Sequence, residues 1–163
     1  MYKRQTYISS STISKVNRNE KVIVDDLFID IFKKSKIIYE KTNGYFDPSI
    51  GLLLDYAGFG PTKNQNIVSQ DSLAIILNTV GFDKIDIVGG QVRKLNNKSK
   101  LDFNAIAKGY AVDVISEFLS SKSIKDYMVD IGGEIRTSGK NHFRDMFWSI
   151  AVSYTHLTLP TIL

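Results

Sequence analysis

The sequence has 163 residues, of which 43% are hydrophobic and 11% aromatic, enough apolar material for the core of one ordinary domain. The formal net charge is +4, but the lysines are scattered among aspartates and glutamates and form no basic stripe, so nucleic-acid binding is not expected. The absence of cysteine excludes disulfides, a thiolate nucleophile and cysteine-bound zinc. The sequence contains no apolar run of about 18 residues and no signal-peptide pattern, so it predicts no membrane span or leader in this segment.

The first half of the chain has the pattern of two helices. Acidic residues followed by apolar residues at a spacing near 3.6 predict a helix over residues 25–41, which ends at Asn43 and Gly44. Ser69 is placed to cap a second helix, and Gly81 is placed to end it in a left-handed conformation.

The second half mixes strands with one long helix. Residues 84–88 and 91–95 flank two glycines and predict a hairpin with a two-residue turn. A strand over residues 99–103 is expected to lead into a helix over residues 105–120, whose wide apolar face can cover a sheet.

Three further strands are expected toward the end of the chain. Residues 127–131 and 134–137 are predicted to pair across Gly132 and Gly133, and residues 147–151 begin another strand. Mixed hairpins and helices favour the α+β class over a doubly wound parallel sheet. With no internal repeat and no low-complexity linker, we expect a single domain.

The two ends of the sequence differ from the rest. Residues 152–163 show neither helical nor strand periodicity. Codons that spell residues 152–161 resemble a transposon-end adapter used in sequencing libraries, and codons for residues 1–5 resemble its reverse complement. We therefore expect residues 6–151 to be a partial natural domain, incomplete at both ends, with adapter-derived scars at residues 1–5 and 152–163.

The densest group of polar residues lies at the start of the helix predicted over residues 105–120. A strand delivers Asp102 and Asn104 to this point, where unpaired backbone N–H groups and the helix dipole favour an anion such as phosphate. Lys108, one turn further on, is a candidate positive contact. The alternative is that Asp102 or Asn104 only caps the helix and Lys108 is solvated.

Two other groups combine glycines with acidic residues. Gly-Tyr-Phe-Asp-Pro-Ser at residues 44–49 precedes Gly-Phe-Gly at residues 58–60, and Val-Asp-Ile-Gly-Gly-Glu occupies residues 129–134. Glycines allow backbone to approach a ligand, but tight turns and a simple hairpin are the alternatives. No Ser-His-Asp triad is indicated, since His142 lies in a polar loop, and no P-loop motif occurs.

In order and spacing, these three groups resemble the ApbE family of FAD:protein FMN transferases. Thr6 and Tyr7, followed by Ile-Ser-Lys-Val-Asn-Arg at residues 13–18, are similar to the family's earlier motifs, so the resemblance covers residues 6–151. It implies an ApbE-like, T-fold-like domain with a mixed sheet and covering helices. It also implies transfer of FMN from FAD, by a phosphoester bond, to a threonine or serine hydroxyl of a target flavoprotein, with AMP released and Mg²⁺ required.

The resemblance also implies which residues form the site. Asp102 is the expected catalytic residue, and the main-chain carbonyl of Ala105 is an expected Mg²⁺ ligand. The residues expected to contact FAD are Thr6, Tyr7, Ala57, Gly58, Phe59, Asp102 and Lys108.

The sequence departs from the family in two places. The family usually has tryptophan where this chain has Ala57, and the downstream Asp-x-x-Thr-Gly-like segment that supplies further magnesium ligands is missing. We therefore expect the parent gene to encode an active transferase and this polypeptide to be inactive. By resemblance, the full-length protein is a lipoprotein on the periplasmic side of the bacterial inner membrane, and its partners are flavoprotein subunits of membrane redox complexes.

The motifs allow three other interpretations. The same site could hydrolyse FAD to FMN and AMP, or it could bind flavin without chemistry. The third is an α+β domain whose motifs are only turns and caps.

Overall fold

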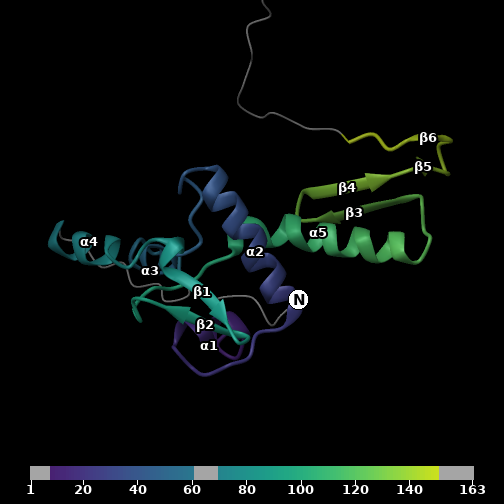
Figure 1. Cartoon of the computed structure of the whole chain (residues 1–163). Helices are drawn as coiled ribbons and strands as arrows, with labels where there is room; N and C mark the ends of the chain where they lie inside the picture. The colour runs from purple at the N-terminus through teal and green to yellow at the C-terminus, as the bar shows by residue number, and fades with distance from the viewer. Residues whose placement is uncertain (1–7, 61–69, 151–163) are drawn as a thin grey trace, which may run out of the picture. The chain divides into compact units, whose positions relative to one another are not determined.

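The computed structural model describes residues 8–60 and 70–150 (Figure 1). It confirms the α+β class: helices precede the first hairpin, and α5 separates that hairpin from the later antiparallel strands. The chain divides into two compact units, here called unit 1 (residues 1–111) and unit 2 (residues 112–163), and the boundary falls inside the longest helix. Among the described residues the strands form three separate two-stranded sheets.

Side-chain caps start the first two helices of unit 1. The hydroxyl of Ser11 accepts from the N–H three residues later, at 3.1 Å, before α1 (Thr12–Asn17). The carboxylate of Asp25 accepts in the same way, at 2.8 Å, before α2 (Asp26–Lys41). α2 therefore confirms the helix predicted over residues 25–41, and its capping residue satisfies one of the backbone donors that a helix start leaves unpaired.

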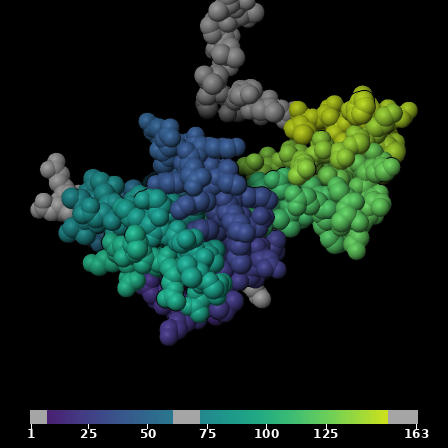
Figure 2. All heavy atoms as spheres, in the orientation of Figure 1, coloured from purple at the N-terminus to yellow at the C-terminus, as the bar shows by residue number. Residues whose placement is uncertain are grey.

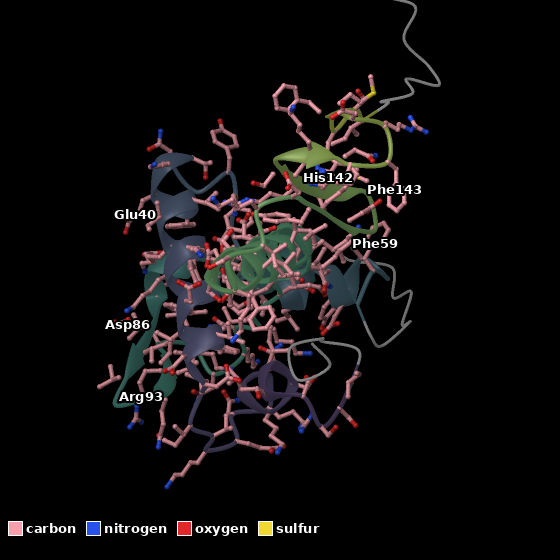
Figure 3. The ribbon with its side chains drawn as sticks, turned by 90° about the vertical axis from the view of Figure 1, so that its right-hand side faces the viewer. Glu40, Phe59, Asp86, Arg93, His142 and Phe143 are labelled. Atoms are coloured by element: carbon pink, nitrogen blue, oxygen red, sulfur yellow. The ribbon has the colours of Figure 1, made fainter. Side chains whose placement is uncertain are left out.

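The remaining short elements of unit 1 follow in chain order. They are α3 (Gly51–Tyr56), α4 (Gln70–Leu77), the 3₁₀ turn η2 (Phe82–Lys84), β1 (Ile85–Val88) and β2 (Gln91–Lys94). β1 and β2 pair across two glycines with positive φ, which confirms the hairpin predicted from this region. Figure 3 shows Asp86 and Arg93, which are opposite each other in the register, on this hairpin.

Gly81 does not close the second helix as predicted. Its φ of 133° is positive, but α4 already ends at Leu77, and Gly81 instead precedes η2. The side-chain amine of Lys84 donates to the carbonyl of Val80 at 2.9 Å and supports this turn. Ser69, the predicted cap of α4, lies outside the described residues.

The core of unit 1 is built from aromatic and branched side chains. Figure 2 shows the residues of this unit, purple to teal, as a closely packed body. Phe28 and Phe103 meet edge to face with ring centroids 5.6 Å apart, and Phe32 lies 4.7 Å from Phe82. The fully or almost fully buried apolar residues are Ile13, Val16, Val24, Phe28, Ile31, Phe32, Ile76, Phe82, Ile85, Leu101, Phe103 and Tyr110.

The strand predicted over residues 99–103 is not a ladder strand. Only one bridge forms there, a parallel pairing of Lys100 with Ile50, so the segment runs extended beside the start of α3. It leads into α5 (Asn104–Ser121), which confirms the helix predicted over residues 105–120. Among the described residues no neighbouring strand pairs along the full length of this segment, so the strand prediction fails here.

The described part of unit 2 contains two short strand pairs and a small core. β3 (Tyr127–Ile131) pairs with β4 (Glu134–Ser138), as predicted, and β5 (Lys140–Asn141) pairs with β6 (Met146–Phe147). Its core consists of Val112, Tyr127 and Val129, with Leu119 and Ile131 packed against them. The strand predicted over residues 147–151 is thus shorter and begins one residue earlier.

The glycine pair of unit 2 makes a turn. Gly132 and Gly133 both have positive φ, and the N–H of Gly133 donates to the carboxylate of Asp130 at 3.0 Å. The hairpin alternative therefore accounts for these residues as they stand. His142, labelled in Figure 3, lies at the β5–β6 turn and pairs with Asp126 at 2.7 Å. No helix in the described part of the chain has the length and apolar character needed to cross a membrane.

Lys94, at the end of β2, is a half-buried cation within unit 1. Its amine donates to the carbonyls of Val16 at 3.1 Å and Ser99 at 3.0 Å. Burial lowers the pKa of Lys94 from 10.5 to about 8, and the charge of Lys100 adds to this effect. The lysine therefore links α1 to the segment before α5 by two hydrogen bonds, and the partial loss of water around its charge costs free energy.

We expect Lys94→Met to flatten the dependence of stability on alkaline pH. The folded pKa lies below the unfolded value, so between about pH 8 and 10.5 the unfolded chain binds more protons, and stability from this group rises with pH. This contribution is lost as pH falls through about 8. The measurement is the free energy of unfolding in urea across this pH window, for wild type, Lys94→Met and the exposed control Lys98→Met. Equal slopes of stability against pH for all three proteins would contradict the lowered pKa of Lys94.

Candidate functional site

Asp102 lies two residues before the first residue of α5, and its side chain caps that first residue. Its Oδ1 accepts from the backbone N–H of Asn104 at 2.7 Å, and its Oδ2 accepts from the Asn104 side-chain amide at 3.0 Å. The carbonyl of Phe103 accepts from the N–H groups of Ile106 and Ala107 at 3.0 and 2.8 Å. The capping alternative raised by the sequence is therefore part of the structure, and it leaves a ligand role for the carboxylate open.

The environment of Asp102 disfavours its charged form. Burial raises the pKa of the Asp102 carboxyl above its usual value, the backbone N–H of Asn104 opposes that rise, and the negative charge of Asp55 adds to it. A cap needs no such burial, since exposed carboxylates cap helices equally well. Carboxyl groups with perturbed pKa values gather at functional sites, which makes Asp102 a candidate beyond its capping role.

The turn that follows α3 contains the three predicted flavin contacts at residues 57–59. Gly58 has φ of 81°, a left-handed conformation that favours glycine. The ring of Phe59 is 73% exposed, and Figure 3 shows it labelled on this loop. Its backbone N–H donates to the carbonyl of Leu54 at 2.9 Å, which fixes the turn to α3. An exposed aromatic ring on a fixed backbone is suited to stacking on a flat ligand.

The structure joins this turn to the segment that carries Asp102. The N–H of Asp102 donates to the carbonyl of Pro48 at 2.8 Å, and the N–H of Gly51 donates to the carbonyl of Lys100 at 3.0 Å. The amine of Lys100 forms an ion pair with Asp55 at 2.5 Å. Two groups that are about 45 residues apart in the sequence are therefore connected through α3.

For the other predicted site residues the structure gives a position on α5 or none. Ala105 lies in the first turn of α5, and Lys108 lies one turn after Asn104 with its side chain exposed. Thr6 and Tyr7 lie outside the described residues, so their predicted role stays a prediction.

Asn17 is a residue of this site that the sequence did not single out for a role. Its side-chain amide donates to the carbonyl of Leu101 at 2.8 Å, and its Oδ1 accepts from the N–H of Leu101 at 2.7 Å. The asparagine therefore replaces a strand partner for the residue next to Asp102. Asn17 belongs to the Ser-Lys-Val-Asn-Arg stretch, but its hydrogen bonds with Leu101 span 84 residues and leave no local signal in the sequence.

Residues 44–49 build turns in the structure. Gly44 has φ of 82° just after α2 ends, and the hydroxyl of Ser49 donates to Asp47 at 2.6 Å. The same hydroxyl accepts from the N–H of Gly81 at 2.7 Å, which connects this turn to η2. The tight-turn alternative accounts for the group, and the turns hold Pro48 where its carbonyl reaches Asp102.

The described residues do not make a complete magnesium site. The predicted ligand, the Ala105 carbonyl, has the Asp102 carboxyl as the one acidic group near it on this segment, and both oxygens of that group already accept from Asn104. No cluster of three or more His, Asp or Glu side chains suited to a metal occurs within residues 8–60 and 70–150. Mg²⁺ usually keeps several waters and binds one or two carboxylates together with substrate phosphates, so further ligands would have to come from the substrate, from water or from residues outside the described ranges.

Comparison with known proteins identifies the family. A family model described as the ApbE family matches residues 2–162. The chain belongs to the ApbE family. The resemblance stated from the motifs is thereby confirmed, and the α+β fold agrees with solved ApbE structures.

Relatives in sequence and solved structures point to the same family. An FAD:protein FMN transferase from Vibrio cholerae is 33% identical over 152 residues, which is 90% of this chain and 45% of the relative. One from Haemophilus influenzae is 31% identical over 159 residues, 92% of this chain and 46% of the relative. Flavin transferase ApbE from Vibrio cholerae superposes with a TM-score of 0.83 at 30% identity, over 92% of this chain and 50% of that one. The flavinyl transferase ApbE of Pseudomonas stutzeri, in its apo form, gives 0.84 at 27% identity, over 92% and 51%.

The chain spans about half the length of the curated ApbE relatives it matches. The matched half carries the turn at residues 57–59 and the start of α5, the two places where the motifs predicted flavin contacts.

We expect Lys108→Ala to weaken FAD binding, with a larger loss at low salt than at high salt. A single exposed cation acts on a phosphate by a charge interaction, which ions screen over about 10 Å at 0.1 M salt. Titration of the full-length protein with FAD at low and high salt measures the effect, with Lys33→Ala, an exposed lysine of α2, as the matched control. A loss that does not change with salt would contradict a direct charge contact.

Proposed function

We propose that the full-length protein containing this chain is an FAD:protein FMN transferase. The observation that carries this proposal is the connection of the exposed turn at residues 57–59 to Asp102 in a chain whose relatives bear that name. The turn offers an aromatic ring for the flavin, and the start of α5 offers the exposed cation Lys108 for the pyrophosphate.

The proposed reaction is a phosphoryl-type transfer. The oxygen of a threonine or serine hydroxyl on the target flavoprotein attacks the phosphorus on the FMN side of the FAD pyrophosphate. One phosphorus–oxygen bond forms, the bond to AMP breaks, and the hydroxyl proton passes to water or to the phosphate of the departing AMP, so the products are a flavinylated protein, AMP and one proton. Such chemistry depends mainly on positioning and on neutralising negative charge, and Lys108 supplies one positive charge among the described residues.

We also propose that the reaction requires Mg²⁺, with the Ala105 carbonyl as one ligand and the remaining ligands outside the described residues. The proposed partners are flavoprotein subunits of membrane redox complexes. The proposed location is the periplasmic side of the inner membrane, with the full-length protein held there by a lipid anchor. The family resemblance supports these three statements.

The test incubates the full-length protein with FAD, Mg²⁺ and a flavoprotein subunit that offers a threonine or serine acceptor. We expect the subunit to gain the mass of FMN and in-gel flavin fluorescence, with one AMP released per flavin attached. Free FMN and AMP without covalent flavin would show a pyrophosphatase instead. FAD binding without AMP would show a binding module, and either result would overturn the proposal.

A further inference from the structure

Asp55 is a buried charge at the end of α3. Its side chain is 10% exposed, and its Oδ2 pairs with the amine of Lys100, which is 36% exposed. Removing a carboxylate from water is costly unless a partner compensates it. A hydrogen-bonding side chain at the surface could end α3 without this desolvation cost. Ending the helix therefore does not explain why the carboxylate of the Asp55–Lys100 pair is buried.

The chain folds tightly around this carboxylate. A Cβ on Gly60 would overlap Oδ1 of Asp55 and lie 2.7 Å from its Cα, so no larger residue fits without displacing Asp55. The N–H of Gly58 donates to the Asp55 carbonyl at 3.2 Å. Asp55 therefore bonds the middle of the turn at Gly58 and packs against Gly60, the residue that follows the turn.

Lys100 belongs to the segment that carries Asp102. Its carbonyl accepts from the N–H of Gly51 at 3.0 Å, and a Cβ on Gly51 would approach that carbonyl to 2.8 Å. Two residues further on, the N–H of Asp102 is bonded to Pro48. The backbone of this segment thus lies against the start of α3, and the Lys100 side chain reaches the other end of α3 at Asp55.

We propose that the Asp55–Lys100 ion pair, closed by Gly60, is a positioning element that holds the turn at residues 57–59 in register with Asp102. Neither side chain contacts the flavin in this role. The pair fixes the distance between the part of the site that holds the flavin ring and the part that holds the pyrophosphate. This inference rests on the proposed function, because it assumes that both parts bind one FAD.

The test uses three variants of the full-length protein. Lys100→Gln removes the cation and leaves the Asp55 carboxylate without its partner. Lys100→Arg keeps the charge and is the conservative rescue. Gly60→Ala changes no polar group and displaces Asp55 sterically. The matched control is Lys34→Gln, which breaks an exposed ion pair with Asp30 at 3.0 Å on α2.

The measurements are the dissociation constant for FAD from flavin fluorescence, the thermal midpoint without FAD, and KM and kcat for transfer. We expect Lys100→Gln and Gly60→Ala each to raise the dissociation constant and KM about tenfold or more, with kcat changed by less than about threefold. Lys100→Arg should restore binding to within about threefold of wild type, and Lys34→Gln should leave it unchanged.

Two results would overturn the inference. If Gly60→Ala binds FAD as wild type does while Lys100→Gln does not, Lys100 contacts FAD directly and the pair is no positioning element. If both variants lower the thermal midpoint and leave FAD affinity unchanged, the pair only stabilises the fold. Should Lys100→Gln fail to fold, the comparison of Gly60→Ala with Lys100→Arg decides by the same criteria.

The proposed function and this inference can fail separately. Wild-type protein that binds FAD but attaches no FMN to the acceptor overturns the function and still allows the affinities to be compared. Wild-type protein that transfers FMN, with all variants binding equally, overturns only the inference.

Discussion

Asp102→Asn is expected to lower FMN transfer by about a hundredfold or more, while the protein stays at least as stable at neutral pH. The substitution replaces one oxygen of the carboxylate by an amide nitrogen and removes its charge. The remaining Oδ1 can still accept from the backbone N–H of Asn104, so the cap on α5 persists. Any large loss of transfer therefore reports the charge of Asp102 and not its capping role.

The sign of the stability change follows from the pKa of Asp102. Burial raises this pKa above its ordinary value, so folding favours the protonated carboxyl. The stability that this carboxyl contributes is present below the unfolded pKa near 3.8 and is lost as pH rises through the folded pKa. At neutral pH the ionised group is a net cost to folding, and asparagine removes that cost.

The measurement compares transfer rate and urea unfolding for Asp102→Asn and Asp25→Asn. Asp25 caps α2 by the same kind of hydrogen bond and lies in no predicted flavin motif, so the same chemical change there should leave both quantities near wild type. Parallel losses of stability and transfer in Asp102→Asn would show that Asp102 serves the fold alone.

The elements that the sequence predicted well depend on local chemistry. The helix over residues 25–41 starts where an aspartate can bond the N–H three residues later, and this interaction needs no distant partner. The hairpins at residues 85–94 and 127–138 turn on glycine pairs that accept positive φ. Such signals lie within a few residues, so a single sequence contains them.

The predictions that failed depended on distant partners. Residues 99–103 are predicted to form a strand, but the segment is held by the side chain of Asn17, by Pro48 and by a single bridge to Ile50. Gly81 is predicted at the end of a helix that stops four residues earlier, and its N–H donates instead to the hydroxyl of Ser49. Both segments make contacts with residues far away in the sequence, which local periodicity does not sample.

The candidate site divides in the same way. Motif spacing predicted the turn at residues 57–59 and the start of α5 as two separate places, and it offered capping as the alternative for Asp102. The structure shows that the cap exists and that the carboxyl is also half-buried near a second negative charge. The Asp55–Lys100 pair that joins the two places spans 45 residues, so local sequence patterns give no sign of it.

Three phenylalanine-to-alanine substitutions are expected to separate the core from the flavin contact. Phe28 is fully buried and packs edge to face on Phe103, the residue that follows Asp102. Phe28→Ala should cost about 3–5 kcal/mol of stability, because it removes a ring from a packed core and leaves a cavity. Since a domain is stable by only about 5–15 kcal/mol, this loss takes much of the margin.

Phe59→Ala makes the same chemical change at an exposed position. With 73% of the residue accessible, its removal should change the free energy of unfolding by less than about 0.5 kcal/mol. If its ring stacks on the flavin, the lost contact of about 0.5–1.5 kcal/mol corresponds to a loss in FAD affinity of up to about tenfold. Residue 57 is an alanine and adds no aromatic surface of its own to this turn.

Phe143→Ala is the control, because Phe143 is fully exposed on the β5–β6 turn of unit 2 (Figure 3). Urea unfolding and FAD titration of the three full-length variants give two readings for each. We expect Phe28→Ala to lose stability most, Phe59→Ala to lose FAD affinity at nearly unchanged stability, and Phe143→Ala to change neither. Equal FAD affinity in Phe59→Ala and Phe143→Ala would remove the turn at residues 57–59 from the flavin site, because the exposed ring is the feature through which that turn is expected to bind.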